Sequence, residues 1–174
     1  MRKVYKIRKG LDIKLKGEVN TDDIRTHLPE LYAVEPDRFR LIKPRLLVQE
    51  GDAVECGTPV IQNKLDERMY LTSPVSGTVK RVVRGDKRKL LAIEIEPDKK
   101  DGKISFGAEN PAGAERGIII EKLLKSGLWP LLRQRPYAII ANPDDTPRDI
   151  FISAFDSCPL AVSDLVMMAF IFSS

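Results

Sequence analysis

Short apolar runs separated by glycine turns fill residues 41–96. Two Gly-Asp pairs begin at Gly51 and Gly85, and the segment TSPVSGTV covers residues 72–79. Apolar positions resume within a few residues of each of these turns. Such spacing is typical of short strands joined by tight turns. The pattern therefore predicts a strand-rich domain, and a weaker alternation in residues 2–17 predicts one more short strand.

The pattern changes after this stretch. Residues 97–114 combine charge with glycine and proline, which is typical of a linker. Residues 116–126 place apolar side chains at helical spacing, and Gly127 is suited to end that helix. Two apolar runs, 138–141 and 150–154, predict buried strands on either side of a Pro/Asp-rich loop. A helix followed by strands indicates the opening of an α/β domain.

These segments predict an α+β chain in three parts. Residues 1–98 form a β-rich barrel-sandwich hybrid, since the Ser-Pro-x-x-Gly-x-Val pattern resembles biotinyl and lipoyl carrier domains. Residues 99–114 are the linker, and residues 115–174 are an incomplete α/β domain. We expect it to be incomplete because only about twenty residues follow Phe155, whereas a parallel sheet needs further crossovers.

Composition excludes several classes of protein. The chain has 29 basic and 25 acidic residues, a net charge of +4, which is too even for a nucleic-acid binder. His27, Cys56 and Cys158 are too few and too scattered for a zinc site or an iron–sulfur cluster. The longest apolar run, residues 165–172, is far shorter than the ~20 residues of a membrane helix, and no signal peptide is visible. We expect a cytoplasmic chain with free thiols, no metal and no catalytic residues.

Lys64 is the candidate for a covalently carried cofactor. In carrier domains the modified lysine lies at a hairpin tip upstream of a strand like residues 72–79. The surrounding sequence, QNKLDERMY, lacks both the biotin-type and the lipoyl-type motif. A solvated hairpin lysine is therefore favoured over a carrier lysine.

Charged clusters elsewhere have plain interpretations. Asp22-Asp23 and Asp144-Asp145 are loop carboxylates that more often form turns or helix caps than catalytic pairs. The basic run KRVVRGDKRK, residues 80–89, predicts a solvated hairpin; the functional alternative is docking to an acidic partner or to anionic lipid. No glycine motif for a nucleotide is present.

The segment WPLLRQRPY, residues 129–137, is the strongest candidate for a ligand site. Arg133 and Arg135 stand beside the aromatic residues Trp129 and Tyr137. Arginine offers a fixed fork of donors and aromatic rings stack on flat molecules, so the segment could line the mouth of a site for a planar, carbonyl-bearing ligand. Composition alone favours the alternative, a capping loop with surface arginines and a buried tryptophan.

Five segments, in this order, resemble one family from about Tyr5 to about Ala161: the A-subunit of the sodium-translocating NADH:quinone reductase. They are KIRKGLDIKLKGE, VQEGDAVECGTPVIQNK, TSPVSGTVKRVVRGDKRKLLAIEIE, GLWPLLRQRPYA and IFISAFDSCPLA. The resemblance implies that residues 115–174 are like the flavoprotein of respiratory complex I in fold. Family members are much longer, so we expect this chain to be a truncated N-terminal part.

The resemblance also implies a role. It indicates a peripheral subunit on the cytoplasmic face of the inner membrane, held by membrane subunits, with membrane contact only through those partners. The chain would bind no cofactor of its own; NAD, flavins and the iron–sulfur centre would lie on partner subunits, and quinone is the substrate. It implies a role in assembly of the complex and in quinone contact. The positions implied for quinone contact are Leu132, Arg133, Arg135, Pro136 and Tyr137, to which the aromatic argument adds Trp129. Two alternatives stay open: a docking subunit of an Rnf-type complex, and a carrier-like module without chemistry.

Overall fold

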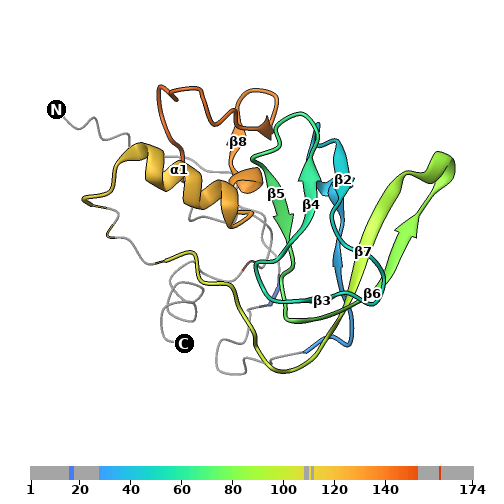
Figure 1. Ribbon diagram of the computed structural model, residues 1–174. Helices are drawn as coiled ribbons and strands as arrows, with labels where there is room; N and C mark the ends of the chain where they lie inside the picture. Colours follow the sequence, from blue (N-terminus) through green and yellow to red (C-terminus); the bar gives the residue numbers. More distant parts are fainter. Residues whose placement is uncertain (1–15, 18–27, 108–109, 111, 153–160, 162–174) are drawn as a thin grey trace. The chain divides into compact units, whose positions relative to one another are not determined.

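The computed structural model describes residues 16–17, 28–107, 110, 112–152 and 161 (Figure 1). Internal contacts divide the chain into two units, Leu28–Thr146 and a second that combines Met1–His27 with Pro147–Ser174. The helices and strands described below all belong to the first unit. Residues 2–15 of the strand expected in residues 2–17, and the side chains of His27 and Cys158, fall outside the described residues; residues 16–17 belong to no strand.

Two antiparallel sheets build the predicted β-rich part. One sheet has the order β1-β7-β6-β3 and the other the order β2-β4-β5. The strands are β1 Tyr32–Val34, β2 Pro44–Leu46, β3 Ala53–Val54, β4 Pro59–Asn63, β5 Tyr70–Thr72, β6 Gly77–Arg84 and β7 Leu90–Pro97, and a 3-10 helix, η1, spans Pro36–Arg38. The sequence-based expectation of short strands in residues 41–96 is confirmed.

The core of this part lies between the two sheets. Buried and more exposed positions alternate over the first residues of β6 and over residues 93–96 of β7, the period-two pattern of strands with one buried face; shifts in the β6–β7 register interrupt this alternation. Val60, Val79, Ile61, Ile93 and Ile95 are fully buried there. β6 and β7 approach each other closely at Gly77, where any Cβ would overlap the backbone carbonyl of Glu96 on β7.

The two Gly-Asp turns differ in backbone geometry. Gly51 has the left-handed conformation, with φ of 92°, that the sequence pattern favours. Gly85 does not, with φ of −101°. Gly85 is followed by the 3-10 helix η2, Asp86–Arg88. In this second turn the left-handed residues are Lys87 and Arg88, with φ of 53° and 61°.

The second part begins with the predicted helix. It contains α1 Arg116–Lys125, the 3-10 helix η3 Trp129–Leu131, and the two-residue strands β8 Arg133–Gln134 and β9 Ile139–Ile140. Gly127, with φ of 75°, ends the helix as expected. The run at 138–141 does contain a strand, but it is half-buried and pairs antiparallel with β8.

The expectation of a strand at 150–154 is wrong for residues 150–152. These residues adopt no regular structure, and Ile150, Phe151 and Ile152 are 77%, 87% and 90% exposed. An apolar run forms a strand only where a neighbouring strand supplies hydrogen-bond partners, and no described strand pairs with this one. Residues 153–154 lie outside the described part of the chain.

A second core joins the barrel to α1. Met69, from the loop before β5, packs with Leu124 of α1 and with Trp129, and all three side chains are buried. Beside this cluster the Thr72 hydroxyl donates a hydrogen bond to the Ser126 carbonyl, 3.2 Å away. The segment between the two parts also follows the barrel, since the Cys56 N–H donates to the Gly102 carbonyl at 2.9 Å.

Candidate functional site

Trp129 lies in the second core and not on a ligand-accessible surface. Its side chain is 7% exposed, and its indole N–H donates to the carbonyl of Ala141 at 2.7 Å. A buried tryptophan needs such a partner for its N–H. The ring therefore fixes η3 against the chain that follows β9. This agrees with the alternative interpretation of residues 129–137 as a capping loop with a buried tryptophan.

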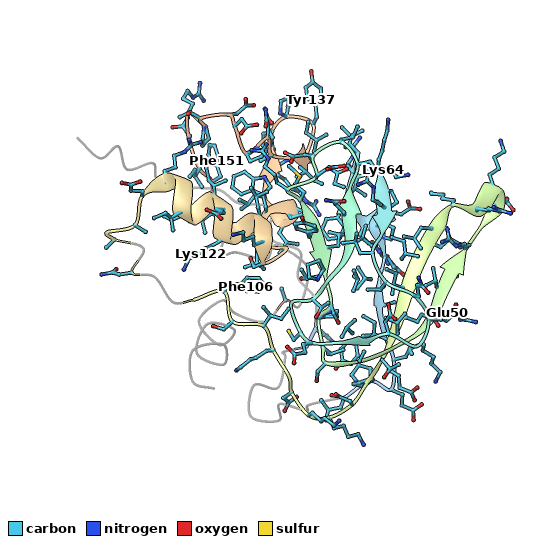
Figure 2. The ribbon with its side chains drawn as sticks, in the orientation of Figure 1. Glu50, Lys64, Phe106, Lys122, Tyr137 and Phe151 are labelled. Atoms are coloured by element: carbon cyan, nitrogen blue, oxygen red, sulfur yellow. The ribbon has the colours of Figure 1, made fainter. Side chains whose placement is uncertain are left out.

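The other five predicted positions lie together on the exposed loop around β8. Leu132, Arg133, Arg135, Pro136 and Tyr137 all face solvent. Tyr137 is 71% exposed and points away from its loop (Figure 2). Within the described residues neither Arg133 nor Arg135 has a carboxylate partner, so both guanidinium groups can bind another molecule. The structure thus separates Trp129, which supports the loop, from the residues that could touch a ligand.

Next to this loop lies a groove of about 510 Å³, within the range of small-molecule sites. It runs between the β4–β5 hairpin, the segment after η1, and β9 with the turn after it. Its apolar lining comes from Leu41, Leu65, Met69, Ile139, Ile140 and Ala141, and its polar lining from Arg40, Asn63, Asp66, Arg68, Asn142 and Asp144. A smaller hollow of about 50 Å³, lined by residues of η1 and η3 and by Arg133, shares Arg40 and Ile140 with the groove.

Arg68 closes one end of the groove with two ion pairs. Its guanidinium donates to Asp66 Oδ2 at 2.7 Å and, through two nitrogens, to both carboxylate oxygens of Asp144 at 2.8 and 2.9 Å. The hydrogen bonds from Arg68 lower the pKa of both carboxyl groups, and the two carboxylates raise the pKa of Arg68. The β4–β5 hairpin is thereby tied to the turn that follows β9.

Arg40 ties the opposite side of the groove to the predicted loop. Its Nη1 donates to the carbonyl of Tyr137 at 2.8 Å, across 97 positions of sequence. The next residue, Leu41, has φ of 68° and is 67% exposed, an uncommon conformation for a branched residue. Arg40 therefore places the loop of Arg133–Tyr137 beside the groove.

Sequence reasoning missed Arg40 and Arg68. The sequence predicts Asp144 as a turn former; it lies in a turn, but the side chain that forms this turn is that of Asn142, whose Oδ1 accepts from the Asp144 N–H at 3.2 Å. The pairing of Asp144 with Arg68 spans 76 positions, and no local spacing signals such a contact. Only the excess of charged residues near both segments could have suggested it.

Lys64 stands where the sequence placed it, on the β4–β5 hairpin and exposed to solvent (Figure 2). Its backbone N–H donates to the Lys43 carbonyl at 2.8 Å. Among the residues that the structure describes, no group of three or more His, Cys, Asp or Glu side chains could hold a metal ion. The described helices are also too short and too polar to cross a membrane.

Comparison with known proteins gives matches over nearly the whole chain. Residues 5–98 match the NqrA N-terminal barrel-sandwich hybrid domain, and residues 114–170 match the NqrA second alpha/beta domain. Three curated relatives are each named as the A-subunit of a Na(+)-translocating NADH-quinone reductase. The protein of Marinomonas sp. is 34% identical over 95% of this chain and 38% of its own length. That of Chlamydia caviae is 34% identical over 97% and 36%. That of Yersinia pseudotuberculosis is 35% identical over 95% and 38%.

The chain thus spans less than two fifths of the length of these relatives. The two matched domains occur in the same order as the two parts described above. They confirm the predicted architecture, a barrel-sandwich hybrid followed by an α/β domain. By these matches, the chain belongs to the NqrA family, the A-subunits of the sodium-translocating NADH:quinone reductases.

Proposed function

We propose that this chain acts within a sodium-pumping NADH:quinone reductase, where it contributes to assembly of the complex and contacts quinone. The observation that carries the proposal is the consecutive match to two NqrA domains, together with relatives that bear the name of the A-subunit. The proposed partners are membrane subunits of the same complex. The proposed location is the cytoplasmic face of the inner membrane, as a peripheral subunit.

The proposed chemistry of this chain is binding and not electron transfer. Partner subunits would supply NAD, flavins and the iron–sulfur centre, and no residue of this chain is proposed as catalytic. The chain's own residues offer a surface on which a quinone can be held while those partners reduce it. This division of roles rests on the family match and on the residue types at the site.

The groove and the adjacent loop support quinone contact. A quinone is a flat apolar ring with two carbonyl acceptors, and the groove combines apolar walls with two guanidinium groups at its rim. Beside the groove, the exposed loop offers the apolar side chains of Leu132 and Tyr137. Its two arginines, Arg133 in the smaller hollow and Arg135, have donors that no described carboxylate occupies. Arginine presents several donors in a planar fork, which suits a carbonyl oxygen. In this proposal Pro136 shapes the loop, and Trp129 holds it in place from the core.

The test uses the assembled complex in solubilised membranes of the host. We expect this chain, used as bait, to recover flavin-bearing membrane subunits. We expect Arg133→Ala and Arg135→Ala each to weaken quinone affinity tenfold or more, since a hydrogen bond to a charged group contributes ~1.5–3 kcal/mol. Tyr137→Ala should weaken it through the loss of an apolar contact. Assembly should stay intact. Arg148→Ala is the control, because this arginine is also exposed but lies outside the loop of residues 132–137 and pairs with Asp149.

Each other outcome removes a defined part of the proposal. Variants that disturb assembly but leave quinone affinity unchanged would limit the loop to docking. Failure to recover any membrane subunit would overturn the assignment to the pump. A mass increment on Lys64 would instead favour the carrier-like module.

A further inference from the structure

The tip of the β6–β7 hairpin extends past the other strands of the barrel (Figure 1). β1 pairs with β7 only at residues 93–95, and β3 pairs with β6 only at residues 77–78. Glu50, labelled in Figure 2, accepts a hydrogen bond from the Val82 N–H at 2.7 Å and supports one arm from the side. Beyond Val82 and Ala92 the two arms pair only with each other among the described strands.

Ion pairs neutralise the arms of this hairpin. Arg81 donates twice to the Glu94 carboxylate, at 2.9 and 3.0 Å, and Lys80 lies 3.4 Å from Glu96. Each basic residue in the middle of β6 thus faces an acid on β7. Within the described hairpin, positive charge without a partner is therefore confined to the tip.

The tip itself has four basic residues and one acidic residue between positions 84 and 89. Lys89 is paired with Asp37, 2.6 Å away. Arg84 donates only to a backbone carbonyl, that of Arg88, at 3.3 Å. Within the described residues, the side chains of Lys87 and Arg88 have no partner. Three cations of the tip therefore face solvent without a described carboxylate.

Backbone geometry gives a second, independent observation. The Lys89 N–H donates to the Asp86 carbonyl at 3.1 Å, which closes a four-residue turn. Both central residues, Lys87 and Arg88, are left-handed, with φ of 53° and 61°. Hairpin turns of this kind strongly favour Asn-Gly, because most side chains are strained there. Lys87 and Arg88 occupy positions where this backbone conformation favours Asn and Gly. We therefore attribute the presence of two long cationic residues there to a role of their side chains.

We propose that this tip binds the anionic phospholipid surface of a membrane. Arg84, Lys87 and Arg88 are exposed at the tip of a hairpin and line neither hollow, which fits a flat layer of phosphate groups and not an enclosed pocket. Guanidinium and ammonium groups both bind phosphate oxygens strongly. Leu91, 38% exposed, adds an apolar side chain next to the tip. The contact goes beyond the proposed function, in which protein partners alone hold the chain at the membrane.

The test measures binding of this chain to vesicles by flotation, at low and at high salt. One set contains phosphatidylcholine alone, and the other mixes it with phosphatidylglycerol. We expect binding to the anionic set only, weakened by salt. The double variant Lys87→Asn, Arg88→Gly should reduce the partition coefficient about 25-fold, since each basic residue near such a surface contributes roughly a factor of five.

This variant separates binding from folding. Because Asn-Gly relieves the strained turn, the urea midpoint of the double variant should rise or stay unchanged while its vesicle binding falls. The control, Lys99→Asn with Lys100→Gln, removes the same charge at the opposite end of the hairpin, where Lys99 is also left-handed with φ of 61°. It should bind like the original chain.

Three results would overturn the proposal. They are equal binding to both vesicle sets, an equal loss in the variant and the control, and unchanged binding of the double variant. The second result would indicate attraction by net charge alone. The vesicles contain no other protein, so none of these results depends on whether the chain assembles into a reductase.

Discussion

Gly127 is the point where helix α1 ends against the barrel, and replacing it tests that junction directly. Its φ of 75° is left-handed, and an added Cβ would lie 2.7 Å from Oγ1 and 2.8 Å from Cγ2 of Thr72 on β5. Gly127→Ala therefore combines a backbone cost with a steric one. Both should appear in the free energy of unfolding.

The magnitude follows from three terms. An alanine in the left-handed region costs about 1 kcal/mol. Moving the Thr72 side chain away breaks its 3.2 Å hydrogen bond to Ser126, about 1 kcal/mol. Residual overlap in a packed region adds about 1–2 kcal/mol. The total loss is about 3–4 kcal/mol.

The same change in a Thr72→Ala background should cost much less. The nearest remaining atom would be Cβ of residue 72, at 3.2 Å from the new methyl group, so only the backbone term of about 1 kcal/mol survives. The expected coupling energy between the two positions is therefore about 2–3 kcal/mol.

Urea unfolding of the four proteins of this cycle measures the coupling. Trp129 is the sole tryptophan of the chain and lies buried at this junction, so its fluorescence reports the transition. If Gly127→Ala cost the same in both backgrounds, Thr72 and Gly127 would not be in contact, and the described packing of α1 on the barrel would be refuted.

Three further changes have defined outcomes. Trp129→Phe leaves a backbone carbonyl without its donor and should lower the unfolding free energy by about 2 kcal/mol, measured by circular dichroism in urea; no change would mean that the indole bond is absent. The hydrogen bonds from Arg68 lower the pKa of Asp144, so this ion pair stabilises the folded state above pH ~4, and that stabilisation is lost as pH falls through the lowered pKa. Arg68→Met should therefore reduce the fall of the urea midpoint between neutral and acid pH. The same fall in the variant and the original chain would contradict the pairing. Gly77→Ala should abolish soluble folded protein, because its Cβ would overlap backbone, whereas Gly113→Ala, with nothing within 4 Å, should be neutral by solubility and thermal midpoint.

Local pattern was enough to predict the elements whose formation depends on near neighbours. The strands of residues 41–96 follow from alternation and turn residues, and α1 follows from its helical spacing and from Gly127. The expected solvated hairpin in residues 80–89 also formed, but its left-handed residues are Lys87 and Arg88, since Gly85 takes an ordinary φ. Turn type depends on how the two arms align, which composition does not reveal.

The candidate site was only partly predictable. The exposed loop of Arg133, Arg135 and Tyr137 could be found from residue types, because arginines beside aromatics are unusual in a short segment. The groove beside it could not, since Arg40 and Arg68 reach their partners across 97 and 76 positions. Contacts of that range depend on how the barrel and the later segment pack, and a single sequence carries no local signal for them.

The core shared by Met69, Leu124 and Trp129 has a consequence for dissecting this protein with proteases. At this junction, side-chain packing and the Thr72–Ser126 hydrogen bond hold the barrel and the α1 segment together, in addition to the covalent chain. A single cleavage between Gly107 and the start of α1 should therefore leave two fragments that stay associated. They should co-elute under native conditions and separate only in denaturant. Either fragment made alone would expose half of an apolar surface, and the two should restore each other's solubility when they are refolded together.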